Sequence, residues 1–269
     1  MKRCIKNLFH LPALIAGFGL ILAGLATAQT FTGLHSFTAT SSSPPYGNTD
    51  GASPYAGLIS SGNTLYGTAQ MGGSSGNGTV FAINTDGTGF TNLHSFFRTS
   101  GNYLTNNDGA NPYAGLILSG NTLYGTVLQG GNSGKGTVFA VNTDGTGFTN
   151  LHSFTDLLSY TNNDGANPFA GLILSGNTLY GTAQMGGSSG NGTVFSLSLP
   201  PPQLTIIPSG ANVILTWPTN ATGLSLQSTT NLLSPAVWTA VSPGPVVVNG
   251  QNTVTNPISG THRLYRLSQ

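Results

Sequence analysis

The sequence has a single cysteine and no glutamate, and each shortage excludes a class of chemistry. The cysteine, Cys4, lies in an N-terminal segment that we expect to be removed on export. The mature chain would then have no disulfide and no thiolate ligand for a metal. Without glutamate, acid–base catalysis by a Glu side chain is excluded. We therefore expect stability to come from packing and backbone hydrogen bonds.

Charged residues are also scarce, at 5% of the chain. Beyond residue 28, four basic side chains stand against six aspartates, a net charge of −2 with histidine neutral. So few basic residues predict no nucleic-acid partner and no attraction to anionic lipid. Glycine, serine, threonine and asparagine supply the polarity instead, and they favour turns and sheet edges over helix.

The N-terminus has the pattern of a secretory signal peptide. Three basic residues among the first six precede an apolar run, Leu11–Leu25, and the small-residue site Ala26-Thr27-Ala28. The run is short for a bilayer span, which needs ~20 residues. We expect the mature chain to begin near Gln29, to be secreted or held in the cell envelope, and not to insert into a membrane after cleavage; an uncleaved anchor is the alternative.

Three tandem repeats occupy most of the remaining chain. The segment Gly62–Phe81 recurs letter for letter as Gly176–Phe195, and Gly120–Phe139 is a close variant of both. The phrase LHSF occurs at 34–37, 93–96 and 151–154, and DGA-x-P begins at residues 50, 108 and 164. These phrases recur every 56 to 59 residues, and a period of about this length indicates a repeat architecture.

Each repeat contains four short strand candidates separated by turn residues. In the middle copy these are Ala114–Ser119, Thr122–Gln129, Gly136–Asn142 and Phe148–Phe154. Four antiparallel strands per repeat are typical of a β-propeller blade. The strands have apolar residues on both faces, which predicts that each sheet is covered on both sides by its neighbours.

The phasing of the repeats suggests how the array ends. It opens with a lone fourth strand, Phe31–Phe37, and closes with only three strands near Phe195. The first strand could complete the last blade and remove its exposed edge. Known propellers have roughly four to eight blades, so three blades could close tightly, form an open arc or pair with a second copy. We favour closure or self-association, because an arc leaves apolar faces in water.

The chain changes character after the proline-rich run. Seven short strand candidates follow, which predicts a small sandwich with Trp217 and Trp238 as packing residues. We predict an all-β protein, a propeller-type array of three four-stranded antiparallel blades plus a small C-terminal β-sandwich. Its parts are a signal peptide (1–28), the three-repeat domain (29–198), a linker (199–203) and the sandwich (204–269).

The phrases LYGT, GG-x-x-G-x-GTVF and LHSF resemble the GloVer-type tandem repeat of exported bacterial proteins. That resemblance implies export and a repeat architecture, and it assigns no chemistry to any residue. The C-terminal phrases VILTWP, LSLQSTTNL and RLYRL are similar to small immunoglobulin- or fibronectin-type modules appended to such proteins.

Histidine and aspartate recur once per repeat. His35, His94 and His152 hold the same place in every LHSF phrase. A single active site needs one copy of each catalytic group, whereas a scaffold needs the same residue in each unit. We therefore predict that each imidazole bridges a hydroxyl or an aspartate within its own blade.

Asp50, Asp108 and Asp164 precede the first strand of each repeat and are candidate ligand-binding residues. If the loops meet at a propeller axis, the three carboxylates would form a ring with oxygen ligands for a hard cation from nearby asparagines. Asp-Gly is also ordinary turn chemistry, and we predict no metal site. The glycine-rich loops at 72–78, 130–136 and 186–192 lack the Lys-Ser/Thr pair of a phosphate cradle, so no cofactor is predicted.

Tyrosines are the other candidate binding residues. Tyr66, Tyr124 and Tyr180 recur in the LYGT phrase, and a further aromatic follows each DGA-x-P phrase. Such rings can line a sugar-binding surface by stacking, although we expect half or more of them in the core. The second set comprises Tyr55, Tyr113 and Phe169.

These observations predict an exported, non-catalytic binding or structural protein. Its ligand would be a polysaccharide or a cell-surface protein, and self-association is a further expectation. The alternative is a carbohydrate-active enzyme, a lyase or hydrolase on a propeller scaffold, with Arg98, Lys135 and Asp156 as the residues that break the repeat. A third hypothesis is an inert fragment of a longer array.

Overall fold

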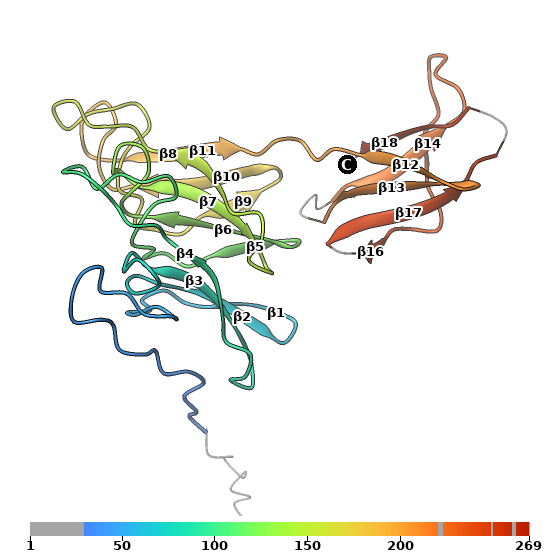
Figure 1. Ribbon diagram of the computed structural model, residues 1–269. Coiled ribbons are helices and arrows are strands. Elements are labelled where there is room, and N and C mark those ends of the chain that lie inside the picture. The colour runs from blue at the N-terminus through green and yellow to red at the C-terminus, as the bar shows by residue number, and fades with distance from the viewer. Residues whose placement is uncertain (1–29, 220–222, 249, 260–261, 269) are drawn as a thin grey trace, which may run out of the picture. The chain divides into compact units, whose positions relative to one another are not determined.

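The structure is a computed structural model that describes residues 30–219, 223–248, 250–259 and 262–268 (Figure 1). The predicted signal peptide, with Cys4, lies outside the described residues. All regular elements in the described ranges are β-strands, arranged in small antiparallel sheets. Accordingly, no helix of membrane-spanning length and hydropathy occurs in these ranges. The predicted all-β class is confirmed.

Each repeat forms one antiparallel sheet. The first has the order β1 (Ile59–Ser61), β2 (Thr64–Ala69), β3 (Thr79–Asn84) and β4 (Thr91–Ser95). The second has the order β5 (Ile117–Ser119), β6 (Thr122–Val127), β7 (Thr137–Asn142) and β8 (Thr149–Ser153). The third has the three strands β9 (Ile173–Ser175), β10 (Thr178–Ala183) and β11 (Thr193–Ser198). Four strands per repeat were predicted, and the first two repeats have them.

The structure of the sheets explains two glycines that recur in every repeat. The hairpin between β5 and β6 closes with Ser119 opposite Thr122, so Gly120-Asn121 is the predicted two-residue turn, and Gly120 has a φ of 58°. Within the LYGT phrase, Gly125 lies opposite Phe139 on β7. A Cβ at Gly125 would stand 2.6 Å from Phe139 Cζ, so only glycine leaves room for the ring.

The three sheets pack face to face through two hydrophobic interfaces (Figure 1). The first interface contains Tyr66, Val80, Ala82 and Phe96 against Leu116, Leu123, Val127, Phe139 and Val141. The second contains Tyr124, Val138, Ala140 and Phe154 against Leu172, Leu179 and Ala183. Burial of each large apolar side chain contributes ~1.5–3 kcal/mol, so these interfaces are the main source of stability in the repeats.

The outer face of the third sheet is bare, contrary to the prediction that neighbours cover both sides of every sheet. Val80 and Val194 occupy the same place in the identical twenty-residue segments, yet Val80 is 0% exposed and Val194 is 83% exposed. Tyr66 and Tyr180 differ likewise, at 7% and 39%. The difference arises because the second sheet covers the Val80 face of the first sheet, whereas no sheet among the described residues covers the Val194 face of the third.

The predicted fourth strand at Phe31–Phe37 does not form, and it does not complete the last sheet. The described residues from 30 to 41 belong to no strand. Leu34 and Phe37 instead pack on the first repeat, against Ala69, Phe81 and Ile83. Leu34 and Phe37 therefore lie on the outer face of the first sheet.

The C-terminal region forms two further sheets. One has the order β12 (Thr205–Ser209), β13 (Asn212–Pro218), β17 (Gln251–Pro257) and β16 (Val246–Val248), and the other β15 (Thr239–Ala240), β14 (Ser225–Thr229) and β18 (Leu264–Ser268). Their shared core holds Leu215, Trp217 and Val254 from the first and Leu226 from the second. Trp217 is 1% exposed, as predicted for a packing residue. Trp238 is half-buried, 4.4 Å beneath the Arg266 guanidinium.

Candidate functional site

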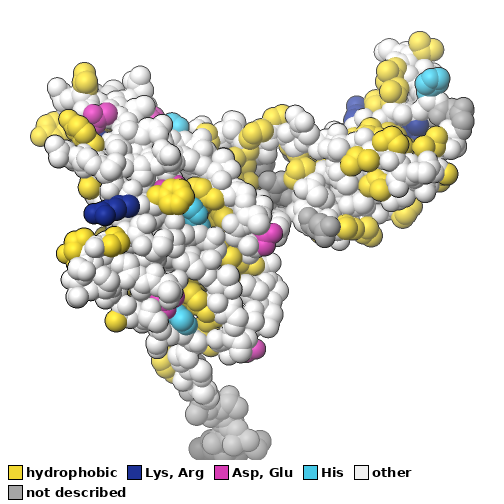
Figure 2. All heavy atoms as spheres, in the orientation of Figure 1, with side chains coloured by type: hydrophobic (Ala, Val, Ile, Leu, Met, Phe, Trp, Pro, Cys, Tyr) yellow, Lys and Arg dark blue, Asp and Glu magenta, His cyan; other side chains and the backbone are white. Residues whose placement is uncertain are grey.

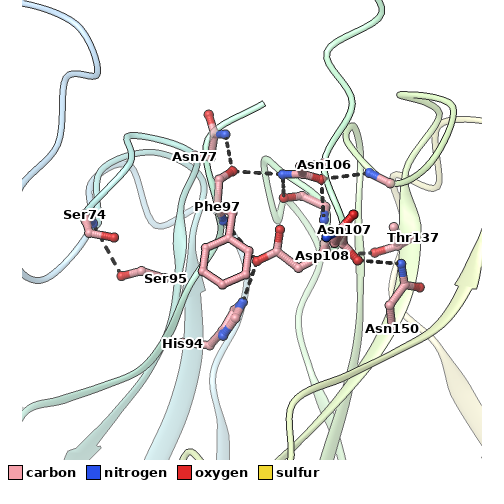
Figure 3. A network of polar contacts seen from close by, with 12 residues as sticks. Ser74, Asn77, His94, Ser95, Phe97, Asn106, Asn107, Asp108, Thr137 and Asn150 are labelled. Carbon is pink, nitrogen blue, oxygen red and sulfur yellow. Dashed lines mark hydrogen bonds and ion pairs between the residues drawn. The ribbon is translucent and has the colours of Figure 1, made fainter. Parts of the chain in front are cut away.

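The repeated histidines and aspartates pair with one another. His94 lies on β4 and its Nε2 is 2.9 Å from Oδ2 of Asp108, which also accepts a hydrogen bond from the Phe97 amide (Figure 3). The pairs His35–Asp50 and His152–Asp164 have the same contact at 3.0 and 2.9 Å. Each pair fastens the end of the LHSF segment to the loop that begins the following repeat.

Each imidazole except the last is also stacked on a phenylalanine. His94 lies 3.7 Å from the Phe148 ring, with 8° between the planes, and His35 lies 3.9 Å from Phe90. Among the described residues His152 has no stacked ring, and its nearest aromatic is an edge contact with Phe154. Phe90 and Phe148 precede the fourth strand of the first and second repeats, and the third repeat has no such segment.

The second carboxylate oxygen distinguishes the three aspartates. The hydroxyls of Thr38 and Thr155 donate to Oδ1 of Asp50 and Asp164. The equivalent residue beside Asp108 is Phe97, which has no hydroxyl. Oδ1 of Asp108 is buried and accepts no hydrogen bond from the described residues. A buried acceptor without a partner costs ~1–3 kcal/mol.

Changing Phe97→Thr should therefore stabilise the protein by about 1 kcal/mol. The introduced hydroxyl would reach Oδ1 of Asp108, and the lost phenyl ring is 58% exposed, so little burial is sacrificed. Urea unfolding measures the change. Thr38→Val is the matched control and should destabilise, because it leaves Oδ1 of Asp50 unpaired. A Phe97→Thr variant no more stable than wild type would show that the oxygen is already satisfied.

Hydrogen bonding also sets the acidity of two of these carboxyls. Burial raises the pKa of Asp50, but hydrogen bonds from the Thr38 hydroxyl and amide and from His35 outweigh it, so the pKa lies below its ordinary value. The pKa of Asp164 is lowered by the same balance, between burial and the bonds from Thr155 and His152. Both groups are therefore ionised at neutral pH.

A fall in stability with acid follows from these lowered pKa values. As the pH falls, the unfolded chain binds protons near the ordinary aspartate pKa of 3.8. The folded chain binds them only at a lower pH, because its pKa is lower. The stabilisation is complete above that pH and is lost as pH falls through the lower folded pKa. Urea unfolding at pH 7, 4 and 3 should show this loss, and Asp50→Asn should flatten it. Equal slopes for wild type and variant would contradict the assignment.

The asparagines near these aspartates form hydrogen bonds with backbone groups. Asn106 Nδ2 donates to the carbonyls of Phe97 and Gly109, and its Oδ1 accepts from the amides of Gly109 and Gly131 (Figure 3). Asn48 and Asn162 repeat this pattern. In the described part of the chain, no three acidic, histidine or cysteine side chains group around a common point. The carboxylate ring considered from the sequence is therefore not seen there.

Two of the three residues that break the repeat form an ion pair. Lys135 Nζ lies 3.5 Å from Asp156 Oδ1. In the first repeat the same loop position is Asn77, whose amide donates to the Phe97 carbonyl (Figure 3). The ion pair thus replaces a loop-to-loop hydrogen bond. Arg98 is exposed, and the described residues place no carboxylate within ion-pair distance of it.

A row of aromatic rings runs along the repeats at the residue after each DGA-x-P proline. The ring centroids of Tyr55 and Tyr113 are 5.5 Å apart, and those of Tyr113 and Phe169 are 4.7 Å apart. Tyr55 is 67% and Phe169 51% exposed, and Tyr113 is half-buried with its hydroxyl bonded to Gln70. We call these three residues the aromatic row.

The other predicted tyrosines lie elsewhere. Tyr66 and Tyr124 are buried in the first and second interfaces, at 7% and 3% exposed. Tyr180 is partly exposed on the bare face of the third sheet. From the sequence, both sets of aromatics were candidates for one surface, with half or more of the rings expected in the core. The structure separates the two sets because the LYGT phrase lies inside a strand and the DGA-x-P aromatic lies in a loop.

Phe90, Phe97 and Phe148 were missed as members of the histidine network. Comparison of aligned repeats contained the signal, since a phenylalanine precedes each fourth strand and the residue after LHSF is Thr38, Phe97 or Thr155. That last position changes the hydrogen bonding of the adjacent aspartate.

Comparison with known proteins identifies the repeat. The chain belongs to the Gloeobacter/Verrucomicrobia repeat family, whose model matches residues 17–211. The recognition of this repeat from its phrases is therefore confirmed. No curated protein matches the chain. A solved structure of a proposed 6-phosphogluconolactonase from Bacteroides uniformis ATCC 8492 matches with 14% identity over 83% of this chain and 75% of that chain, at a TM-score of 0.27, which does not establish a shared fold.

Proposed function

We propose that the protein is an exported, non-catalytic binding protein whose repeats, as successive blades of a propeller-type array, present the aromatic row to a neutral polysaccharide. The row is the observation that carries the proposal, because two of its three rings are more than half exposed. Aromatic rings offer apolar area to the C–H faces of sugars. Charged residues are 5% of the chain, and the face of the molecule drawn in Figure 2 has few of them, which suits an uncharged ligand.

A binding role fits the repeated polar residues better than the alternative of a carbohydrate-active enzyme. Each repeated histidine contacts an aspartate of the scaffold, and Lys135 contacts Asp156. These contacts hold loops together and require no reaction chemistry. The C-terminal pair of sheets, similar in sequence to immunoglobulin- or fibronectin-type modules, would act as a spacer or sorting module in the cell envelope.

Polysaccharide binding by the mature chain tests the proposal. Pull-down on insoluble cellulose, chitin and xylan, together with a glycan array with and without calcium, should give a retained signal and no released product. Tyr55→Ala should weaken that binding roughly 2- to 12-fold, in line with the ~0.5–1.5 kcal/mol of an aromatic contact. Tyr103→Ala, which removes a ring 70% exposed in another loop, is the control. Absence of binding, or an unchanged Tyr55→Ala variant, contradicts the proposal, and released product favours the enzyme.

A further inference from the structure

The two ends of the repeat array are complementary halves of the interfaces found inside it. Val194 and Tyr180 on the bare face of the third sheet correspond to Val80 and Tyr66, which are buried where the first sheet meets the second. At the other end, Leu58 is 49% exposed, whereas its equivalents Leu116 and Leu172 are 3% and 4% exposed against a preceding repeat. Each end therefore lacks the neighbour that the opposite end would provide.

The third sheet also lacks a strand that the N-terminal segment matches in sequence. Residues 31–37 read FTGLHSF, and the segments that supply β4 and β8 read FTNLHSF. In the first sheet Val80 pairs with His94 and Thr79 with Ser95. The same register on β11 would pair Val194 with His35 and Thr193 with Ser36. Neither the edge of β11 nor the N-terminal segment has such a partner in the described structure.

His152, beside the third sheet, lacks the stacked phenylalanine ring that the other two repeated histidines have. His35 and His94 stack on Phe90 and Phe148, each the first residue of an FT-x-LHSF segment. His152 has no stacked ring among the described residues, and it lines an open pocket with Phe154 and Phe195. Phe31 is the equivalent phenylalanine of the N-terminal segment, and it is 98% exposed.

A threonine hydrogen bond and the aromatic row both connect each repeat to the next, and both end at the third repeat. The hydroxyls of Thr68 and Thr126 donate to the carbonyls of Ala114 and Ala170 in the next repeat. Thr182 is the equivalent residue of the third repeat, and no such next repeat follows it in the described chain. The aromatic row likewise has exposed rings at its two ends, Tyr55 and Phe169.

We infer that a second copy of this chain binds head to tail on the bare face of the third sheet. Its Phe31–Phe37 segment becomes the missing fourth strand beside β11, and its first sheet covers Val194 and Tyr180. Phe31 of the second copy fills the pocket at His152. The donated segment keeps its contacts with its own first sheet, since β4 and β8 pack on the following repeat while they pair within their own sheets.

A second copy explains these observations better than closure within one chain. Leu34 and Phe37 are held on the first repeat while the third sheet stays bare, so the three repeats of one chain do not meet end to end. Two copies joined at both ends would form a ring of six sheets, within the roughly four to eight of known propellers. A contact of this kind that does not close would continue as a chain of copies.

The mature chain beginning at Gln29 tests this inference by sedimentation and light scattering over the micromolar range. Dimers or longer head-to-tail assemblies are expected. Val194→Asp should weaken association at least ~100-fold, because it buries an unpaired carboxylate in the contact, and circular dichroism should show an unchanged fold. Val247→Asp, at a residue 66% exposed on the C-terminal sheets, is the matched control and should leave association unchanged. A monomer throughout the range, or association unaffected by Val194→Asp, overturns the inference.

Disulfide trapping shows whether the strand beside β11 comes from the same chain or from a second copy. A mixture of chains carrying Thr193→Cys or Ser36→Cys should form linked pairs, as the Thr79–Ser95 register predicts. A chain carrying both substitutions that links only to itself would show that the strand comes from the same chain, and it overturns the inference. Failure of polysaccharide binding leaves these two measurements unaffected, so the two proposals fail separately.

Discussion

Replacing His94 by alanine should destabilise the protein by about 3 kcal/mol. The change removes the contact with the buried Asp108 carboxylate and the face-to-face contact with Phe148 at 3.7 Å. Loss of one member of a buried charged or hydrogen-bonded pair typically costs ~3–5 kcal/mol. The lower end applies here because the Phe97 amide still donates to Asp108. Urea unfolding of the mature chain at neutral pH measures the effect.

His152→Ala is the matched control for this result. His152 makes the same contact with Asp164, but its side chain is 35% exposed, against 12% for His94, and it has no stacked ring among the described residues. At dilutions where the chain is monomeric, its loss should cost about 1 kcal/mol. Equal costs for the two variants would contradict the role assigned to burial and to the Phe148 ring.

Phe139→Ala should have a comparable or larger effect, about 3–5 kcal/mol. Phe139 is 0% exposed, and its ring lies 5.4 Å from Phe96 and 5.6 Å from Phe148 in the first interface. Truncation would leave a cavity beside Gly125, which has no side chain to fill it. Thermal and urea unfolding should both report the loss.

Phe195→Ala tests whether the cost comes from the interface or from the strand itself. Phe195 occupies the same position in the third repeat, is only half-buried, and has one ring contact, with Phe154 at 5.2 Å. Its removal should cost about 2 kcal/mol or less. If both variants lose the same stability, packing between sheets is not the main source of stability.

The strands of the repeats were predictable because their signals are local. Turn residues such as Gly120-Asn121 and the apolar pattern of β6 and β7 specify where each strand begins and ends. Repetition predicted that each histidine pairs with a hydroxyl or an aspartate of its own blade. The partner is an aspartate, but it lies in the loop that begins the following repeat. The sequence did not show this, because the loop that brings Asp108 to His94 has no pattern of its own, and Asp108 had separately been a ligand candidate.

Burial and strand formation at the two ends of the repeat array could not be predicted from the sequence. Val80 and Val194 lie in identical segments, so no local property of the letters distinguishes a buried position from a bare one. What differs is the neighbour, which depends on whether another repeat follows. For the same reason the sequence indicated Phe31–Phe37 as a strand, although a strand forms only where a partner edge is within reach.

Thiol labelling at these two valines tests the central claim most directly, namely that each sheet is covered by the sheet of the following repeat, and that the outer face of the third sheet is bare because no such sheet follows it. Residues 29–269 contain no cysteine, so in a chain of these residues Val80→Cys and Val194→Cys each introduce a single thiol. In dilute, monomeric protein the thiol at position 194 should react with Ellman's reagent at about the rate of an unfolded peptide. The thiol at position 80 should react only on unfolding, more slowly by several orders of magnitude. Similar rates at the two positions would contradict the account.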